Sequence, residues 1–467
     1  MSNRQKLYIN GEWVTPHGTE TFEIIDPRTA TGVDTIVLGD EQDVDAAVAA
    51  ARAAFEGEEW PLAERVATLR KVAELITERT EEFADLISQE MGAPEAFSRA
   101  VQVQFPLRVL TTTVDIAEKF DFDQPLGPST LAHEPVGVVA AITPWNFPLH
   151  QVVAKVAPAL AAGCPVVLKP AELTALSAVM FAEVMDEAGV PAGWFNLVQG
   201  RGPVAGAALA KHPDVDMVTF TGSTAVGREI AALAAATIKR VTLELGGKSP
   251  ALLLDDLDDE GFKAAVLRAH GFSLFNCGQT CASWTRLIVP EDRYQQTLEI
   301  LRESAANVAP TLGPLVSQTQ WNRVHDKLKL ALDEGATLEI GEVEDAPGEG
   351  YWMSPKVFGR VDPQAEIAQQ ETFGPVLVVQ TYTDRDEAVR LANSTIYGLS
   401  AGVFGADQEE AFRIARKIRS GSVHVNGVNT NPLAPFGGMG QSGYGREYGE
   451  LGLREFLEIK SIQPPGE

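Results

Sequence analysis

The chain has 467 residues, of which 45% are hydrophobic, enough for large cores in a globular protein. At roughly 100–200 residues per domain, this length predicts two to four domains. Lys and Arg number 38 against 64 Asp and Glu, which gives a formal net charge of −26. A charge of this sign repels phosphate backbones and anionic lipids, so it argues against nucleic-acid and membrane partners.

No segment of the sequence reads as an export signal or a membrane span. Residues 1–13 lack the continuous apolar run of a secretory signal, and the most apolar stretch, Val136–Leu168, contains four prolines and Lys155. The chain has three cysteines, Cys164, Cys277 and Cys281, which favours a reducing compartment over a disulfide framework. The cysteines at 277 and 281 have no second pair of ligands at zinc spacing. We therefore expect a cytoplasmic protein without a metal site.

Apolar residues at helical spacing predict three helices near the N-terminus, at Val44–Phe55, Leu62–Met91 and Glu95–Phe120. Beyond them strands and helices alternate, which is typical of a parallel sheet with helices on both faces. The first series comprises strands at Pro165–Lys169, Phe195–Val198 and Met217–Phe220 and a helix at Leu173–Ala188. The second has helices near Glu260–Leu274, Glu291–Ala306, Gln318–Glu334 and Glu409–Ile418. The sequence thus predicts two α/β domains, the first doubly wound, with a hinge near Leu245-Gly246-Gly247.

Cys281 and Glu244 form a candidate catalytic pair. Cys281 ends the polar run Phe275-Asn276-Cys277-Gly278-Gln279-Thr280-Cys281, and Glu244 lies in Leu243-Glu244-Leu245-Gly246-Gly247-Lys248. A thiolate attacks carbonyl carbon well, and a nearby carboxylate can draw a proton from water to hydrolyse the resulting thioester. Taken singly, a cysteine is more often a packed core residue and a glutamate a solvated charge. Their shared polar, glycine-containing setting indicates covalent catalysis on a carbonyl group.

A candidate cofactor site lies in Thr219-Phe220-Thr221-Gly222-Ser223-Thr224-Ala225-Val226-Gly227, where a strand runs through Gly222 into a helix that begins near Thr224. Free amides at a helix N-terminus attract phosphate, and Ser223 can add a hydroxyl, although a simple capped turn has the same pattern. Lys169 and Glu172 follow another buried strand and could hold ribose hydroxyls. A carboxylate there would repel a 2′-phosphate, which predicts NAD over NADP.

Asn146 is a candidate oxyanion donor. It lies in Thr143-Pro144-Trp145-Asn146-Phe147-Pro148, where prolines on both sides stiffen the backbone. A side-chain amide aimed at a developing alkoxide contributes about 3–4 kcal/mol to a reaction of this kind. The alternative is a turn asparagine that bonds only its own backbone.

With these residues the chain resembles the NAD(P)-dependent aldehyde dehydrogenase superfamily, nearly from end to end. Seven motifs stand in the family's order: Pro144–Pro148, Lys169–Glu172, Phe220–Thr224, Leu243–Pro250, Gly278–Cys281, Glu371–Pro375 and Pro435–Gly438. The resemblance implies an α/β fold with a Rossmann-type cofactor domain in residues 1–121 and 140–246. It also implies an α/β catalytic domain in residues 247–445 and a small β oligomerisation element in residues 122–139 and 446–467.

The resemblance implies roles for individual residues. Cys281 would be the nucleophile, Glu244 the base and Asn146 the oxyanion donor, with Lys155 near the cofactor. The implied cofactor-binding residues are Thr143, Trp145, Lys169, Glu172, Gly222, Ser223, Leu245, Glu371 and Phe373, of which Glu371 and Phe373 would position the nicotinamide half. The implied substrate pocket comprises Phe147, His150, Gln151, Ala154, Thr280 and Ala282 together with Asn426–Pro432.

The pocket residues favour a neutral aliphatic or aromatic aldehyde. Ala154 and Thr280 are small and leave room for a bulky chain, while Phe147 and Trp284 would supply an apolar wall. These stretches hold no arginine or lysine for a second carboxylate. His150 is a polar contact in this pocket or a packed histidine.

Other functions stay open beside this interpretation. A coenzyme A-acylating dehydrogenase shares the nucleophile but generally lacks the carboxylate that Glu244 supplies, and a non-catalytic binding protein with this fold would not need the three catalytic residues. A thiol esterase would turn over without NAD. The alternating segment Leu457–Ile462 predicts an edge strand that pairs with another chain in a homodimer or homotetramer. A helical turn would bring Cys277 close to Cys281, either as an incidental neighbour or with a redox role.

Overall fold

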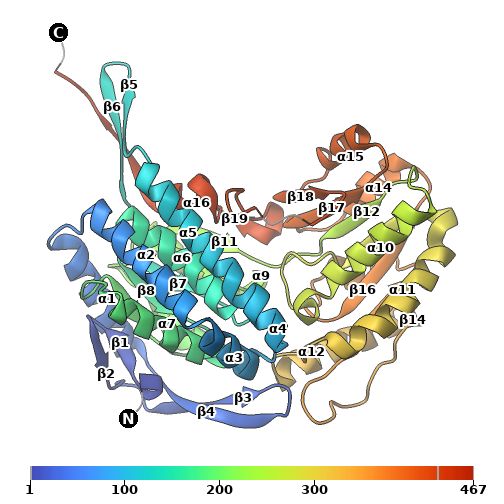
Figure 1. The fold of residues 1–467 in the computed structure, drawn as a ribbon, viewed down its shortest axis with the longest axis horizontal. Coiled ribbons are helices and arrows are strands. Elements are labelled where there is room, and N and C mark those ends of the chain that lie inside the picture. Colours follow the sequence, from blue (N-terminus) through green and yellow to red (C-terminus); the bar gives the residue numbers. More distant parts are fainter. Residues whose placement is uncertain (1–2, 429–430, 466–467) are drawn as a thin grey trace.

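The computed structural model describes residues 3–428 and 431–465. Figure 1 shows two helix-covered sheets and a small sheet that projects beside the C-terminus. The large sheets have eight and seven strands, the projecting sheet has three, and a two-stranded ribbon of β3 (Glu20–Asp26) and β4 (Thr31–Leu38) lies near the N-terminus. The expected α/β fold is therefore confirmed, while the domain limits given above stay predictions.

The eight-stranded sheet is doubly wound. Its strands are β1 (Leu7–Ile9), β2 (Glu12–Val14), β7 (Val139–Ile142), β8 (Val166–Lys169), β9 (Phe195–Leu197), β10 (Met217–Thr221), β11 (Arg240–Glu244) and β19 (Gly443–Tyr444). Strands β7 to β11 are mutually parallel, and the spatial order is β19-β11-β10-β7-β8-β9-β1-β2. The chain therefore winds outward in both directions from β7. Ligands of such sheets bind at the carboxyl ends of the strands where the winding reverses, here β7 and β10.

Helices bury both faces of this sheet. They are α1 (Glu41–Glu56), α2 (Leu62–Glu78), α3 (Thr80–Met91), α4 (Glu95–Phe97), α5 (Gln104–Lys119), α6 (Pro148–Ala162), α7 (Ala175–Glu187), α8 (Ala207–Lys211) and α9 (Thr224–Ala235). Every one of the 15 residues of α6 is buried, because this helix lies between the sheet and α2 and α5. Among the described residues, no helix is long and apolar enough to cross a membrane.

The seven-stranded sheet belongs to the second half of the chain. Its strands are β12 (Pro250–Leu253), β13 (Arg286–Pro290), β14 (Thr337–Ile340), β15 (Lys356–Gly359), β16 (Val376–Tyr382), β17 (Ser400–Phe404) and β18 (Ser422–Val425), all parallel except β14. Its helices are α10 (Asp259–Ser273), α11 (Tyr294–Val308), α12 (Gln318–Asp333), α13 (Glu366–Gln369), α14 (Arg385–Ala392) and α15 (Gln408–Ala415). Both predicted α/β series are thus present.

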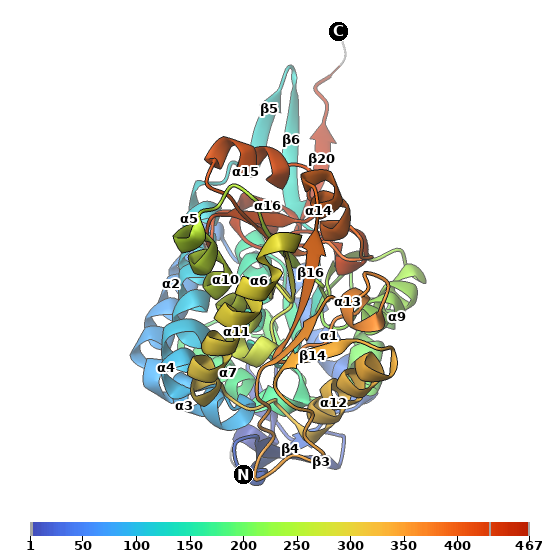
Figure 2. The ribbon, with the colours of Figure 1, turned by 90° about the vertical axis from the view of Figure 1, so that its right-hand side faces the viewer.

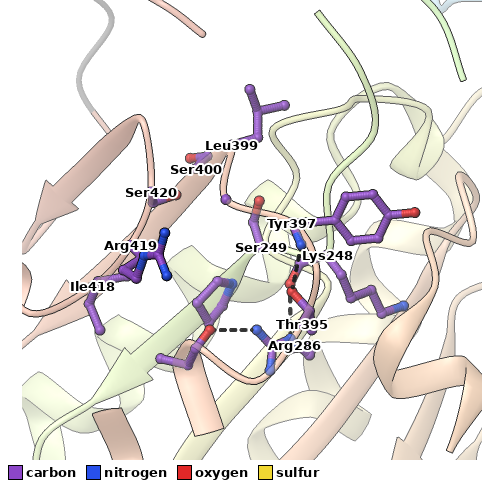
Figure 3. Close-up of a pocket in the computed structure, with 13 residues that line it drawn as sticks. Lys248, Ser249, Arg286, Thr395, Tyr397, Leu399, Ser400, Ile418, Arg419 and Ser420 are labelled. Atoms are coloured by element: carbon purple, nitrogen blue, oxygen red, sulfur yellow. Dashed lines mark hydrogen bonds between the residues drawn. The ribbon is translucent and has the colours of Figure 1, made fainter. Parts of the chain in front are cut away.

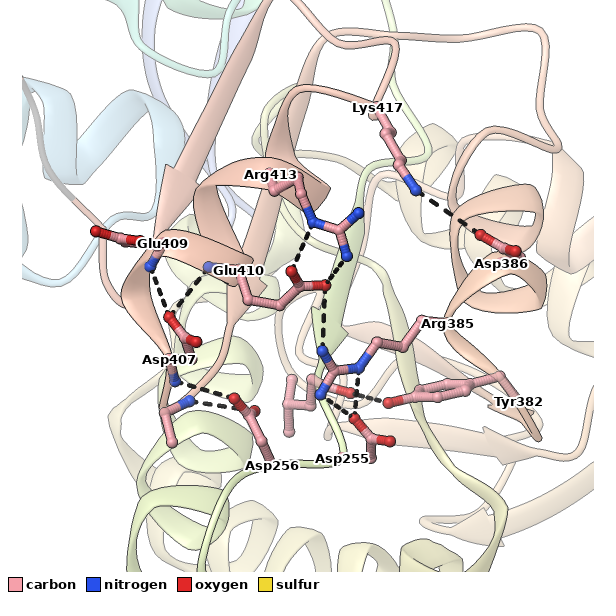
Figure 4. Close-up of polar contacts among 12 residues, drawn as sticks. Asp255, Asp256, Tyr382, Arg385, Asp386, Asp407, Glu409, Glu410, Arg413 and Lys417 are labelled. Atoms are coloured by element: carbon pink, nitrogen blue, oxygen red, sulfur yellow. Dashed lines mark hydrogen bonds and ion pairs between the residues drawn. The ribbon is translucent and has the colours of Figure 1, made fainter.

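The loop after β12 is held by polar contacts to α14 and α15 (Figure 4). Arg385 donates to Asp255 at 2.7 Å, and Asp256 accepts from the backbone amides of Ala406 and Asp407 at 3.2 and 2.9 Å. Exposed ion pairs of this kind contribute up to about 1 kcal/mol each. Their main effect is to fix the path of the loop that leads into α10.

The projecting sheet has the order β20-β6-β5, built from β5 (Asp123–Leu126), β6 (Ser129–Pro135) and β20 (Leu457–Ile462). Figure 2 shows this sheet standing away from the rest of the molecule. The prediction of an edge strand at the C-terminus is confirmed, since β20 pairs only with β6 in the described chain. Ile459 and Ile462 are 65% and 51% exposed on it.

One of the predicted N-terminal helices, Leu62–Met91, is wrong as a single helix. It is divided at Arg79, beside Thr77 and Thr80, whose hydroxyls donate to backbone carbonyls of the preceding turn. The predicted helix Glu95–Phe120 is present without a break, but its residues Ser98–Val103, between α4 and α5, are π-helical. Pro106 lacks the amide hydrogen that an α-helix would aim at the fourth carbonyl before it, so the widened turn fits the proline.

Candidate active site

The predicted catalytic residues come from the switch point of the eight-stranded sheet. Thr143 and Asn146 follow β7, Thr221 ends β10 and Glu244 ends β11. Because β7, β10 and β11 are parallel neighbours, their carboxyl ends meet at one edge. The loop with Cys281 reaches this edge from the other half of the chain, where the Cys281 carbonyl lies 2.7 Å from the point that a Cβ on Gly247 would occupy. Gly247 thus allows close approach of two loops.

The loop before Cys281 has an unusual backbone. Asn276, Cys277 and Gly278 are all left-handed, with φ of 54°, 56° and 71°. Such a conformation costs roughly 1–2 kcal/mol for each non-glycine residue, so the surrounding contacts must hold it. The fully buried Gln279 supplies them, since its side chain donates to the Pro314 carbonyl and accepts from the Val316 amide. The strained loop gives Cys281 a fixed position.

The expected helical turn between Cys277 and Cys281 is wrong, because the left-handed residues interrupt it. Cys277 is 3% exposed and packs in an apolar cluster with Leu315, Trp321 and Val324, whereas Cys281 is partly exposed. The two thiols therefore occupy different environments.

Asn146 is attached to the Cys281 loop. Its side-chain Nδ2 donates to the Gln279 carbonyl at 3.0 Å, two residues before the nucleophile. Its own backbone carbonyl accepts from Gln102 at 3.1 Å and from Asn276 at 2.9 Å, and the residue is 3% exposed. One of the two amide hydrogens of Asn146 is used in the bond to Gln279. No acceptor for the second is present among the described residues.

Glu244 is a buried carboxylate without a hydrogen-bond partner among the described residues, for either oxygen. Burial, followed by the negative charge of Glu447, raises the pKa of Glu244 well above its ordinary value, and Lys155 acts in the opposite direction. A buried carboxylate of this kind is costly unless a ligand or water meets it. Because its pKa is raised, Glu244 binds a proton more tightly than an ordinary glutamate, as a general base must.

The surroundings of Cys281 disfavour ionisation of its thiol. Burial raises its pKa first, and the carboxylates of Glu371, Glu244 and Glu447 raise it further. All three carboxylates are thus close enough to act on the thiol electrostatically. A thiolate forms here only if its proton has an acceptor, which the nearby carboxylates can provide.

Lys155 lies beside a residue that the sequence analysis did not identify. Its Nζ donates to the Thr221 hydroxyl at 2.7 Å and forms a buried ion pair with Glu447. Glu447 and the adjacent Tyr448 are almost 300 positions away in the sequence, so no local pattern links them to Lys155. Their only sequence signal is their position shortly after the motif Pro435–Gly438, whose Phe436 pairs with Glu447 in an antiparallel bridge.

Glu371 and Phe373 lie on the other side of the Gly246-Gly247 turn. Glu371 accepts from the Gly247 amide at 3.0 Å, and burial raises its pKa to about 7. Phe373 is left-handed, with φ of 59°, and its ring meets Trp145 edge-on at a centroid distance of 5.4 Å. An aromatic ring pair and a buried carboxylate thus flank the Gly246-Gly247 segment.

The predicted phosphate site has the expected local geometry. Helix α9 begins at Thr224 as predicted, and the Ser223 hydroxyl caps it by accepting from the Val226 amide at 3.4 Å. The Ser223 hydroxyl hydrogen is still free to donate to an anion. Leu245 packs against Gly227 of this helix, and a Cβ there would clash with it at 2.5 Å.

Lys169 and Glu172 lie together at the end of β8. The buried Lys169 Nζ donates to Glu172 at 3.3 Å, and Arg201 lies 3.8 Å from the other oxygen of that carboxylate. Thr143, at the end of β7, has a buried hydroxyl without a partner among the described residues. This donor set fits a nucleotide sugar and its phosphates.

The predicted pocket residues are divided between two segments. Phe147, His150, Gln151 and Ala154 are buried on or beside α6, while Thr280 and Ala282 flank Cys281 and are partly exposed. Asn429 and Thr430 of the expected pocket segment lie outside the described residues. Trp284 was a wrong prediction as a pocket wall, because its ring is 0% exposed and packs against Phe272 and Phe404 in the core.

Two cavities lie near these segments without reaching Cys281. Figure 3 shows a pocket of about 10 Å³ beside Lys248 and Arg286, which holds about one water molecule. Burial lowers the pKa of Lys248 there to about 7. A larger groove of about 540 Å³ lies between α5 and Asn431–Leu433. Its polar rim is lined by Asp115, Lys119 and Glu450.

The chain is similar over nearly its whole length to known aldehyde dehydrogenases. Residues 13–462 match the model of the "Aldehyde dehydrogenase family". The chain is 42% identical to 3-succinoylsemialdehyde-pyridine dehydrogenase of a Pseudomonas species, over 99% of both chains. It is 44% identical to a mutant of Aldehyde Dehydrogenase C of Pseudomonas syringae solved with NAD⁺ and octanal, with a TM-score of 0.97 over 100% of this chain and 98% of that one. A point mutant of betaine aldehyde dehydrogenase of Staphylococcus aureus with NAD⁺ is 36% identical, with a TM-score of 0.94 over 98% of this chain and 97% of that one.

Proposed function

The chain belongs to the aldehyde dehydrogenase family, and we propose that it oxidises a neutral aliphatic or aromatic aldehyde to the carboxylic acid with NAD. The observation that carries this proposal is that the loop of Cys281 meets the strand end with the buried, unpaired carboxylate of Glu244, at one edge of the first sheet. A nucleophile and a base in one site are what an acyl intermediate and its hydrolysis require.

Cys281 begins the reaction by attacking the aldehyde carbon. A nearby carboxylate takes the thiol proton, and the carbonyl oxygen becomes an alkoxide. Asn146 stabilises that oxyanion with the amide hydrogen that Gln279 does not use. NAD, when bound, accepts the hydride that leaves this carbon, which leaves a thioester on Cys281.

Glu244 completes the cycle by hydrolysing the thioester. Its oxygens have no protein partner, so one of them can accept a proton from a water molecule. The hydroxide equivalent adds to the acyl carbon, the carbon–sulfur bond breaks, and the acid leaves while the thiol recovers a proton. Lys155 and Glu447 form a buried ion pair near this base. Their charges act on the Glu244 pKa in opposite directions.

The cofactor would be held by residues whose contacts suit its parts. Gly222, Ser223 and the N-terminus of α9 would take the pyrophosphate, and Lys169 with Glu172 the adenosine ribose. Trp145 would line the same adenosine and pyrophosphate site, and Glu371 and Phe373 would position the nicotinamide ribose and ring. The remaining cofactor-binding residues would be Thr143 and Leu245. We expect NAD over NADP because Glu172 repels a 2′-phosphate; a higher kcat/KM with NADP would contradict this.

The substrate is proposed to be neutral because the basic groups of the site are already paired. Lys155 is bound to Glu447, and the six pocket residues carry no arginine or lysine. A relative bound to octanal fits this class. Strong preference for succinic semialdehyde would refute it.

We also propose a homodimer or homotetramer assembled through β5, β6 and β20. The exposed edge of β20 carries Ile459 and Ile462 and offers backbone groups to a second chain. A monomeric mass in light scattering would contradict this assembly.

The test is NADH formation, followed by absorbance, from short, long and aromatic aldehydes with NAD or NADP, with and without coenzyme A, for the native chain and Cys281→Ala. NADH without coenzyme A that disappears in the variant supports hydrolytic oxidation. Dependence on coenzyme A would favour an acylating dehydrogenase, and turnover without NAD an esterase. Cofactor binding with no turnover across the panel would favour a binding protein.

A further inference from the structure

His150 and Tyr448 form a hydrogen-bonded pair inside an otherwise apolar aromatic cluster. The His150 Nε2 and the Tyr448 hydroxyl are 2.6 Å apart, and His150 is 5% exposed. Five phenylalanines make ring contacts with this pair or with one another: Phe97, Phe105, Phe147, Phe275 and Phe436. The two polar rings are therefore the only hydrogen-bonding side chains in that described cluster.

The cluster adjoins the reacting groups. The charges of Glu447, Cys281 and Glu244 all disfavour ionisation of the Tyr448 hydroxyl, whose pKa is raised well above its ordinary value, first by burial. Phe147 directly follows Asn146, and Phe275 belongs to the loop that carries Cys281. The pair and its aromatic neighbours therefore border the nucleophile.

A count of protons shows that the pair has one donor to spare. Burial lowers the pKa of His150 to about 3, so at neutral pH its imidazole carries one N–H. Together with the Tyr448 hydroxyl the pair owns two hydrogens, and the mutual hydrogen bond uses one of them. If Tyr448 donates, the Nδ1–H of His150 is unused; if His150 donates from Nε2, the Tyr448 O–H is unused.

The spare donor has no acceptor in the described part of the chain. Nδ1 of His150 is buried and unpaired, and the Tyr448 hydroxyl has no second partner. A buried donor without a partner is unfavourable, and native proteins rarely leave one so. The hydrogen-bonding capacity of the pair is therefore not used up within the described part of the chain.

We propose that His150 and Tyr448 determine substrate specificity by donating one hydrogen bond to an acceptor on the aldehyde's chain, such as a ketone oxygen, an ether oxygen or a ring nitrogen. This inference rests on the proposed function and narrows its substrate class. The preferred substrate is a neutral aldehyde with an aromatic or apolar body and one acceptor remote from the reacting carbonyl. Purely apolar aldehydes leave the donor unpaired and react less efficiently.

The test uses two matched pairs of probes: 4-oxo-4-phenylbutanal with 4-phenylbutanal, and 3-(pyridin-3-yl)propanal with 3-phenylpropanal. For the native protein we expect kcat/KM to favour the acceptor-bearing aldehyde by about tenfold in at least one pair, the value of one good hydrogen bond. In Tyr448→Phe this ratio should fall to within about twofold. His150→Gln keeps a group at the position of Nε2 but none at Nδ1, and a ratio lost there too identifies Nδ1–H as the donor.

Tyr382→Phe is the matched control, because it removes a buried hydroxyl that donates to the Leu253 carbonyl, away from the cluster, at 2.9 Å. Its ratio should equal that of the native protein. A native ratio near one in both pairs, or a ratio that persists in both cluster variants, overturns the inference. No NADH from any probe or simple aldehyde contradicts the proposed function instead, so the two failures are distinguishable.

Discussion

Glu90 and Glu244 are both buried glutamates, but their surroundings are opposite. Glu90, on α3, accepts hydrogen bonds from the backbone amides of Leu176 and Ser177 at 2.8 and 3.1 Å, in the first turn of α7. Glu244 has no partner among the described residues. Burial raises the pKa of both, to about 7 for Glu90. Burial alone therefore does not distinguish the two carboxylates; the difference is that Glu244 has both oxygens free to meet a ligand or water.

The two glutamates should differ most in their effect on turnover when each carboxylate is neutralised by substitution with glutamine. We expect Glu244→Gln to lower steady-state kcat by about 10²–10⁴-fold, the usual contribution of a general base. Its free energy of unfolding should not fall, because the variant removes an unpaired buried charge. Turnover and urea denaturation measure the two effects. A kcat within threefold of the native value would contradict the role of Glu244.

Asn146→Ala tests whether the amide held by Gln279 serves the reaction. Loss of one oxyanion donor lowers kcat by about 10²–10³-fold. The control is Asn196→Ala, which removes a buried amide bonded to Gly193 at 2.8 Å in the same sheet. The control should lose stability and keep its kcat. Equal losses of kcat in both variants would contradict a catalytic role and show that Asn146 acts only through the structure.

Cys277 and Cys281 should differ in their reactivity toward an alkylating reagent. Because burial and three carboxylates raise the pKa of Cys281, its alkylation by iodoacetamide should be slow at pH 7 and rise about tenfold per pH unit up to pH 9. Cys277, 3% exposed, should stay unmodified in the folded protein. Peptide mass spectrometry reads both sites. Fast, pH-independent alkylation of Cys281 would contradict the carboxylate surroundings.

Glu90→Gln should have the smallest effect on turnover, within about twofold. Its effect is on stability, and the sign follows from the pKa shift: the folded protein retains the proton to about pH 7, whereas the unfolded chain releases it near pH 4.5. The native protein's stability relative to the variant should therefore fall by roughly 3 kcal/mol at most between pH 4.5 and pH 7. Urea unfolding across this range measures it, and a pH-independent difference would count against the buried, partly protonated Glu90.

The sequence predicted features that depend on local patterns. Buried strands such as Met217–Phe220, the helix that begins at Thr224 and the edge strand Leu457–Ile462 follow from composition and period, and the structure has them. The division at Arg79 and the π-helical segment Ser98–Val103 were missed because apolar periodicity continues through both positions. Short-range hydrogen bonds of threonines and a missing proline amide decided the backbone there.

The site could be predicted only where a residue stands in a recognisable motif. Cys281, Glu244 and Asn146 do, but Glu447 and Tyr448 take their places through contacts with Lys155 and His150 far away in the chain. Trp284 failed as a pocket residue for the same reason, since its neighbours Phe272 and Phe404 come from other elements. Side-chain partners across the fold are set by packing, which one chain's pattern does not contain.

The most direct test of the account is intact-protein mass spectrometry of Glu244→Gln mixed with NAD and octanal. If Cys281 forms the thioester and Glu244 hydrolyses it, the variant should gain one octanoyl group per chain, released by hydroxylamine and absent from the double variant with Cys281→Ala. Glu90→Gln should show no accumulation under the same conditions. An unmodified Glu244→Gln that still releases NADH over many turnovers would contradict the central claim.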